Sequence, residues 1–244
     1  MSGAVRDCPS PNRDDRPPAT PIDTLVLHYT GMPTAQAALD RLCDPAARVS
    51  AHYLVTEEGA IWRLVAEQLR AWHAGVSFWR GHVALNDRSI GIEIVNPGHE
   101  FGYRDFPVLQ LAAVCDLCLE LLARHPIPAR NVVAHSDIAP ERKQDPGERF
   151  PWTALAANGV GLFPAGVPDR GTGGAVRDAA SLRDVRGALA AIGYRVAAEG
   201  PLDPALVAVL RAFQRHWRNE AVTGEADAGT LVRLLAVARL AEGG

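Results

Sequence analysis

A proline- and glycine-rich stretch, residues 164–176 (PAGVPDRGTGGAV), divides this chain into two parts of different character. Before it, short apolar runs typical of strands alternate with helical patterns. After it, three helical patterns follow one another without a strand. The length of 244 residues suits one medium domain and one small domain. We therefore predict a mixed α/β domain over residues 21–163, a linker over 164–176 and a three-helix domain over 177–244.

The individual elements follow from periodicity and from capping residues. The chain begins with residues 1–20, which are rich in Pro, Asp and Arg and have little to bury, so they predict a flexible leader. Strands are expected at 23–29, 89–95 and 131–135, with a hairpin formed by 51–56 and 60–65. Helices are expected at 34–42, 108–123, 182–192, 205–217 and 227–241.

Composition excludes several classes of protein. The 25 Lys+Arg and 28 Asp+Glu leave a formal net charge of −3, which excludes binding of nucleic acid through bulk positive charge. No apolar run approaches the ~18 residues of a membrane span. The first twenty residues lack the ~7–15-residue apolar stretch of a secretory signal. We therefore expect a cytoplasmic protein, with the periplasm as the alternative. The four cysteines form no disulfide scaffold, and Cys115 and Cys118 are interpreted as small core residues.

Two of the eight histidines stand at the ends of predicted strands, where side chains reach the cleft beyond a sheet edge. These are His28 and His135, and Asp145 follows ten residues after the second. Two imidazoles and one carboxylate match a catalytic zinc site that keeps its fourth position for water. A histidine at a strand end is equally compatible with a packed or surface role, and chemistry alone leaves that alternative open.

Two charged residues also need an explanation. Strand alternation places Glu93 on the face opposite the isoleucines of residues 89–95, where Gly91 leaves space beside the carboxylate. A carboxylate in an apolar strand is costly unless it is paired or functional, although a solvated sheet face is the alternative. Lys143 is the single lysine among 25 basic residues. An ammonium and a guanidinium do different chemistry, but an arginine-biased composition explains that count as well.

Five separated blocks together carry a resemblance to a known family. They are residues 27–30 (LHYT), 49–55 (VSAHYLV), 71–75 (AWHAG), 85–93 (LNDRSIGIE) and 133–147 (VAHSDIAPERKQDPG). In this order they resemble the zinc-dependent N-acetylmuramoyl-L-alanine amidases of the AmpD/AmiD type, which share a fold with peptidoglycan-recognition proteins. The resemblance covers about residues 20–155. It implies an α/β fold in which helices flank a mixed central sheet.

The resemblance also implies roles for individual residues. It implies that His28, His135 and Asp145 bind zinc, and that Glu93 and Lys143 are catalytic in hydrolysis of the amide between the lactyl group of N-acetylmuramic acid and L-alanine. Glu93 would take the proton from the attacking water, and Lys143 would stabilise the oxyanion. The candidate substrate contacts around the metal are Tyr29, Trp72, His73, Arg80 and Asn86.

Residues 181–240 are similar to the three-helix peptidoglycan-binding domain that is often attached to cell-wall hydrolases. A stabilising appendage without a ligand is the alternative. The expected partners are soluble anhydro-muropeptides or polymeric peptidoglycan. A different class of function is a receptor that binds muropeptides without cleaving them. Loss of a metal ligand would mark that class, and all three ligands are present.

Overall fold

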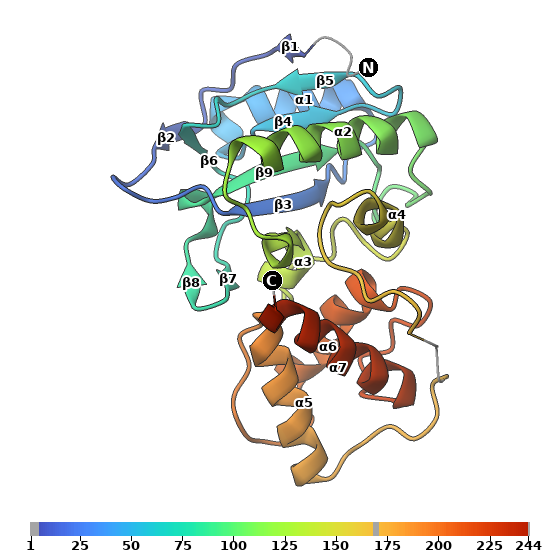
Figure 1. Ribbon diagram of the computed structural model, residues 1–244. Coiled ribbons are helices and arrows are strands. Elements are labelled where there is room, and N and C mark those ends of the chain that lie inside the picture. The colour runs from blue at the N-terminus through green and yellow to red at the C-terminus, as the bar shows by residue number, and fades with distance from the viewer. Residues whose placement is uncertain (1–4, 168–170, 244) are drawn as a thin grey trace.

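A six-stranded mixed sheet forms the centre of the N-terminal domain in the computed structural model, which describes residues 5–167 and 171–243 (Figure 1). The order across the sheet is β1-β5-β4-β9-β3-β10. Its strands are β1 (Arg6–Asp7), β3 (Thr24–Tyr29), β4 (Tyr53–Val55), β5 (Ile61–Arg63), β9 (Ser89–Ile94) and β10 (Val132–Ala134). Two small antiparallel pairs join β2 (Arg13–Asp15) to β6 (Leu69–Ala71) and β7 (Phe78–Trp79) to β8 (His82–Val83). The predicted α/β class with a mixed central sheet is confirmed.

The register of three neighbouring parallel strands decides which side chains meet. β3 lies between β9 and β10 and runs parallel to both. His28 pairs with Glu93, and Leu27 pairs with Ala134, which immediately precedes His135. Directly paired residues point to the same face of a sheet. The carboxyl ends of these strands therefore present polar side chains together, at the edge where open α/β sheets bind ligands.

Helices cover the two faces of the sheet. Helix α2 (Val108–Arg124) lies across one face, where its residues Val114, Leu117 and Leu121 pack into the same cluster as Leu25 and Ile92 (Figure 1). Helix α1 (Ala35–Cys43) packs on other sheet residues and is capped by Thr34, as predicted. The remaining short elements of this domain are α3 (His135–Ile138), α4 (Trp152–Ala157), η1 (Pro45–Ala47), η2 (Leu85–Asp87) and η3 (Ala129–Asn131).

Within residues 171–243 the C-terminal part forms three helices, as predicted: α5 (Ala179–Ile192), α6 (Pro204–Trp217) and α7 (Ala228–Gly243). Its core is continuous with the sheet domain, because Leu189, Leu210 and Phe213 belong to the same buried cluster as Val26 and Val133 of the sheet. The two domains therefore share one hydrophobic core on the face that α2 does not cover. Among the described residues, no helix has the length and apolar character needed to cross a membrane.

The prediction of a flexible leader over residues 1–20 is wrong for residues 5–20, while residues 1–4 lie outside the described part of the chain. β1 pairs with β5 and β2 pairs with β6. Asn12 is buried, and its amide nitrogen donates to the carbonyls of Asp44 and Val49. A low apolar content therefore did not leave this segment disordered, because its polar side chains satisfy backbone groups of neighbouring loops.

The predicted linker, residues 164–176, is partly outside the described residues, which omit 168–170. On its C-terminal side the chain is held by the helical domain. The amide of Gly229 donates to the carbonyl of Gly171, the amide of Ala228 donates to that of Gly173, and Val176 donates to Ala226. These contacts make the end of the stretch part of the helical domain's surface.

Arg16 provides a test of how the N-terminal segment contributes to stability. Its guanidinium donates to the backbone carbonyls of Glu67, Asn86, Asp87 and Ser89. We expect Arg16→Ala to lower the free energy of unfolding by about 2–4 kcal/mol, because buried carbonyls lose their donors. Urea unfolding followed by circular dichroism measures this, with exposed Arg13→Ala as the control. Equal midpoints for the two variants would contradict the assignment.

Candidate metal centre

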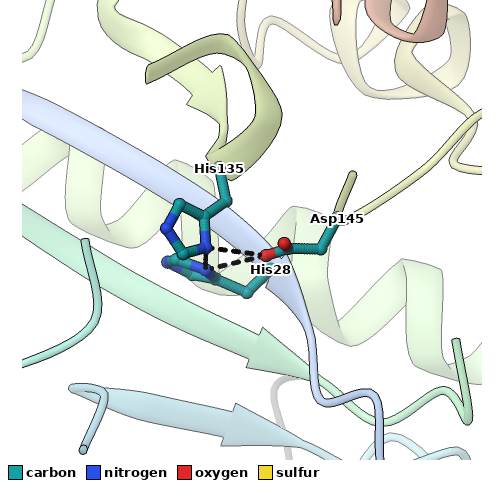
Figure 2. A group of neighbouring side chains, drawn as sticks. All are labelled: His28, His135 and Asp145. Atoms are coloured by element: carbon teal, nitrogen blue, oxygen red, sulfur yellow. Dashed lines mark hydrogen bonds and ion pairs between the residues drawn. The ribbon is translucent and has the colours of Figure 1, made fainter. Parts of the chain in front are cut away.

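Three side chains far apart in the sequence converge at one point (Figure 2). The Nδ1 atoms of His28 and His135 lie 2.9 Å apart, and each lies 3.0 Å from Oδ2 of Asp145. All three residues are buried. A tetrahedral zinc ion with bonds of about 2.0–2.1 Å separates its ligand atoms by roughly 3.3 Å. The triangle therefore has nearly the size that one such ion requires.

Different elements deliver the three ligands. His28 stands near the end of β3, and His135 begins α3 directly after β10. Asp145 lies in the loop that follows α3, and its carbonyl accepts a hydrogen bond of 3.0 Å from the amide of Ser136. Gly147 lets this loop turn, because its φ is +84° and an added Cβ would lie 2.3 Å from the hydroxyl of Tyr103.

The partner of Nε2, the ring nitrogen that points away from the centre, shows which nitrogen of each imidazole carries the proton. Nε2 of His135 lies 3.2 Å from the carbonyl of Ala74, which can only accept, so Nε2 carries the proton and Nδ1 keeps its lone pair. Ser89 donates to the carbonyl of Leu85 and therefore accepts from Nε2 of His73.

The same reasoning fixes the tautomer of the other ligand. Because Nε2 of His73 is the donor, its Nδ1 accepts from Nε2 of His28 at 3.0 Å. Nδ1 of His28 is then unprotonated, and its lone pair also points to the centre. Two imidazole lone pairs and a carboxylate oxygen face one another without a proton between them. Such an arrangement is unfavourable unless a cation lies among them, so the donor set itself fits a divalent metal ion.

Burial and neighbouring charges put the ligands in the protonation states that metal binding needs. Burial, together with His135, lowers the pKa of His28 to about 4. Burial alone would raise the pKa of Asp145, but the adjacent His135 and His28 rings act in the opposite direction and hold the pKa of Asp145 well below its usual range. Near neutral pH the centre therefore offers a neutral His28 and an ionised carboxylate.

Glu93 stands beside the centre without a partner of its own. Its Oε2 is enclosed and has no hydrogen-bond partner in the described part of the chain. Burial and the charge of Asp145 raise the pKa of Glu93 well above its usual value, while Lys143 acts in the opposite direction. A carboxylate with a raised pKa is a stronger base, and its protonated form can return the proton.

The space that Gly91 leaves beside Glu93 is occupied by the ring of His73. An added Cβ at Gly91 would lie only 2.4 Å from Cγ of His73. Any side chain at position 91 would overlap the His73 ring, so glycine is required here for His73 to pack on the strand and contact His28. His73 was expected to contact substrate. It does line the cleft, but its two ring nitrogens are engaged by His28 and Ser89.

The centre opens into a cleft of about 470 Å³. The cleft brings together six of the ten residues that the sequence singled out, Tyr29, His73, Glu93, His135, Lys143 and Asp145. His28 is buried behind this lining, where it contacts His73, His135 and Asp145. Lys143 is half-buried in the wall of the cleft near Glu93. A carboxylate, a cation and the three-ligand centre thus share one cavity.

Three candidate substrate contacts do not line this cleft, and each of them has a partner within the protein. Trp72 donates its indole N–H to Asp14 at 2.7 Å. Arg80 donates to the carbonyls at the end of α5, Ala191 and Ile192. Asn86 is buried, and its Oδ1 accepts from the amides of residues 73 and 74. Each of these contacts joins segments that are distant in sequence. A local sequence pattern therefore could not show whether the side chain binds substrate or another part of the protein.

Arg142 is the site residue that the sequence analysis missed. Its guanidinium donates to the carbonyls of Ala74 and Val76 and lies 3.5 Å from Nε2 of His135. It therefore holds the carbonyl that orients His135. In the sequence, Arg142 could have been identified as a site residue only by its position next to Lys143. In a chain with 24 arginines that indication is weak.

Comparisons with known proteins agree with this geometry. The chain is 41% identical over 228 residues to N-acetylmuramoyl-L-alanine amidase AmiD of Escherichia coli (strain K12), which spans 86% of this chain and 79% of that protein. It is 38% identical over 170 residues to 1,6-anhydro-N-acetylmuramyl-L-alanine amidase AmpD of Citrobacter freundii, spanning 63% and 89% of the two chains. The fold is similar, with a TM-score of 0.79 and 39% identity over 93% of each chain, to E. coli AmiD in complex with the substrate anhydro-N-acetylmuramic acid-L-Ala-D-gamma-Glu-L-Lys.

Two family models match separate parts of the chain. Residues 178–234 match the model described as a putative peptidoglycan binding domain, which covers most of the three helices. Residues 18–148, which include His28, His135 and Asp145, match the model described as N-acetylmuramoyl-L-alanine amidase. Since this match extends over more than half of the sequence, the chain belongs to the N-acetylmuramoyl-L-alanine amidase family.

Proposed function

We propose that this protein hydrolyses the amide bond between the lactyl group of N-acetylmuramic acid, or its anhydro form, and L-alanine of a peptidoglycan stem peptide. The observation that carries the proposal is the complete set of His28, His135 and Asp145 beside Glu93 in one cleft. The similar AmiD structure holds an anhydro-muramyl peptide as its substrate, which supports this substrate class.

Zinc is the metal that we propose for the centre. Two neutral imidazoles and one carboxylate form a ligand set typical of catalytic zinc sites, which leave a position open. When bound, the ion would supply Lewis-acid activation of water and of the amide carbonyl. The remaining ring nitrogens of His28 and His135 donate to His73 and to the carbonyl of Ala74, and such partners keep a ligand's orientation and basicity.

Glu93 and Lys143 would divide the remaining chemistry. Glu93 takes a proton from the attacking water through its unpartnered carboxylate and returns it to the amine of the departing L-alanine. Lys143 lies on the cleft wall, where its ammonium can stabilise the negative charge of the tetrahedral intermediate. Tyr29 also lines the cleft and would contact the substrate, and burial raises its pKa to about 12, so its hydroxyl stays protonated.

The compartment decides between soluble anhydro-muropeptides and polymeric peptidoglycan. We infer soluble fragments, and with them the cytoplasm, because the similar AmpD of Citrobacter freundii is named a 1,6-anhydro-N-acetylmuramyl-L-alanine amidase. The helical domain favours the periplasm and the polymer instead, through its match to a putative peptidoglycan binding domain. Cell fractionation with an antibody against the protein distinguishes the two.

Metal removal tests the proposed function directly. Anhydro-N-acetylmuramyl tripeptide is incubated with the protein, and mass spectrometry follows release of the peptide with a free L-alanine amine. We expect cleavage to stop after dialysis against dipicolinate and to return when zinc is added. Cleavage by the metal-free protein would overturn the zinc assignment. Binding of the fragment without cleavage, in the presence of zinc, would favour a receptor.

Substitution of Glu93 separates the proton-transfer role from metal binding. We expect Glu93→Gln to lower kcat by roughly 10²–10⁴-fold, because the amide cannot accept the proton. Zinc content, measured by atomic absorption, should stay at the level of the unaltered protein, since Glu93 is not a ligand. Glu100→Gln on the exposed part of the cleft is the matched control. Turnover of Glu93→Gln equal to that of the control would remove the role.

The pH profile gives a second readout for Glu93. Because the base acts in its ionised form, activity should fall as the pH decreases through its pKa, which burial has raised above the ordinary glutamate value. The acid limb of kcat/KM should therefore lie above the ordinary pKa of glutamate, and Glu93→Gln should lack it. The same acid limb in both proteins would assign the titration to another group.

Lys143→Arg tests whether a compact ammonium is needed. We expect kcat to fall by roughly 10²–10³-fold while KM changes much less, because the planar guanidinium cannot take the same position beside the oxyanion. Arg41→Lys, elsewhere in the wall of the cleft, is the control that exchanges the same two groups. Steady-state kinetics with an unchanged kcat would show that position 143 only needs a positive charge.

A further inference from the structure

Asp137 is a buried carboxylate that the mechanism does not use. It is 1% exposed and lies in α3, two residues after the ligand His135. Its Oδ2 accepts from the amide of Ala134 at 2.8 Å and from Nδ1 of His216 at 2.7 Å. Its Oδ1 accepts from the hydroxyl of Tyr194 at 2.5 Å. Two of these three donors belong to the helical domain.

The contact with Ala134 connects Asp137 to the ligand. Ala134 is the last residue of β10, and His135 follows it as the first residue of α3. The hydrogen bond from its amide to the Asp137 carboxylate closes the turn between strand and helix. Because α3 has only four residues, it lacks the length to be stable alone. The orientation of His135 therefore depends on how Asp137 is held.

His216 is held rigidly on its side of the contact. Its ring stacks between those of Trp152 and Trp217, with centroid distances of 3.7 and 3.6 Å. Its Nε2 is buried and has no partner among the described residues, so the neutral tautomer with a proton on Nδ1 is the one that fits. The ring can thus donate to Asp137 only in the orientation observed.

Tyr194 is fixed by the segment that precedes it. The amide of Arg80, in the β7–β8 turn, donates to the carbonyl of Gly193 at 2.9 Å. An added Cβ at Gly193, whose φ is +144°, would lie 2.7 Å from Cγ of Arg80. Trp79, the last residue of β7, packs edge-on against the Tyr194 ring. Contacts with the sheet domain therefore hold the end of α5 in place and orient the Tyr194 hydroxyl toward Asp137 in α3.

We propose that Tyr194 and His216 are positioning residues through which the helical domain holds the metal ligand His135 in place. The domain that matches a peptidoglycan-binding module would then be a structural part of the metal centre. The proposal rests on the proposed function, in that it takes His135 as a ligand. It gives the shared core of the two domains a role in the chemistry as well as in stability.

The test removes the two donors and keeps the packing. Tyr194→Phe loses only the hydroxyl, and His216→Phe keeps an aromatic ring between the two tryptophans. We expect the double variant to bind zinc about 10-fold more weakly, the lower end of the loss when a direct partner of a metal ligand is removed, because the two donors act on His135 through Asp137 and Ala134. Competition with a chromogenic chelator measures the affinity. The absorption bands of bound Co²⁺, which report ligand geometry, should shift as well.

Arg186→Met is the control for general damage to the helical domain. Arg186 is buried there and donates to the carbonyl of Pro201, away from Asp137. We expect this variant to lower the melting temperature while zinc affinity and the Co²⁺ spectrum stay unchanged. If the double variant fails to fold, Tyr194→Phe alone serves, with a smaller loss of affinity in the same direction.

The outcomes separate this proposal from the proposed function. Unchanged zinc affinity and Co²⁺ spectrum in folded Tyr194→Phe and in the double variant would overturn the positioning role, while the amidase assignment would stand. Equal losses of affinity in Arg186→Met would also overturn it, since domain stability would then be the cause. Failure of the unaltered protein to bind zinc would overturn both proposals.

Discussion

The parallel register of β3 with its two neighbours is the constraint on which the cluster of His28, His135 and Asp145 depends. It places His28 beside Glu93 on one side, and it brings the end of β10, and with it His135, alongside on the other. A shift of one residue would turn these side chains to the opposite face and expose the apolar residues that pack against α2. The core therefore enforces the register, and the register assembles the site.

A second set of contacts, behind the two histidines, orients the rings that the strand register brings together. His73 and Ser89 determine the tautomer of His28, and the carbonyl of Ala74, itself held by Arg142, determines that of His135. Each partner comes from a different segment of the chain. These contacts keep the imidazole lone pairs directed at the centre before a metal ion binds. Metal binding therefore requires less rearrangement of the side chains.

Much of this could be predicted from local patterns. The alternation in residues 89–94 placed Glu93 opposite the isoleucines, and the structure puts those isoleucines in the core that α2 covers. The capping residues Thr34 and Asp203 marked helix starts correctly. Local patterns did not predict the partners of Arg80, Asn86 and the N-terminal segment, because these partners are backbone groups distant in sequence, which no periodicity reports.

Period, capping and spacing are properties of the linear chain, and they suffice for the class of each part, α/β before the linker and helical after it. They marked His28, His135 and Asp145 only as candidates, and the resemblance to the amidases made these residues a definite prediction. The three-dimensional packing alone decided which nitrogen of each histidine faces the centre, that His73 stands behind His28, and that Asp137 is gripped by Tyr194 and His216. The physical reason is that a hydrogen bond depends on the separation of atoms in space, and that separation exists only once sheet and helices share a core.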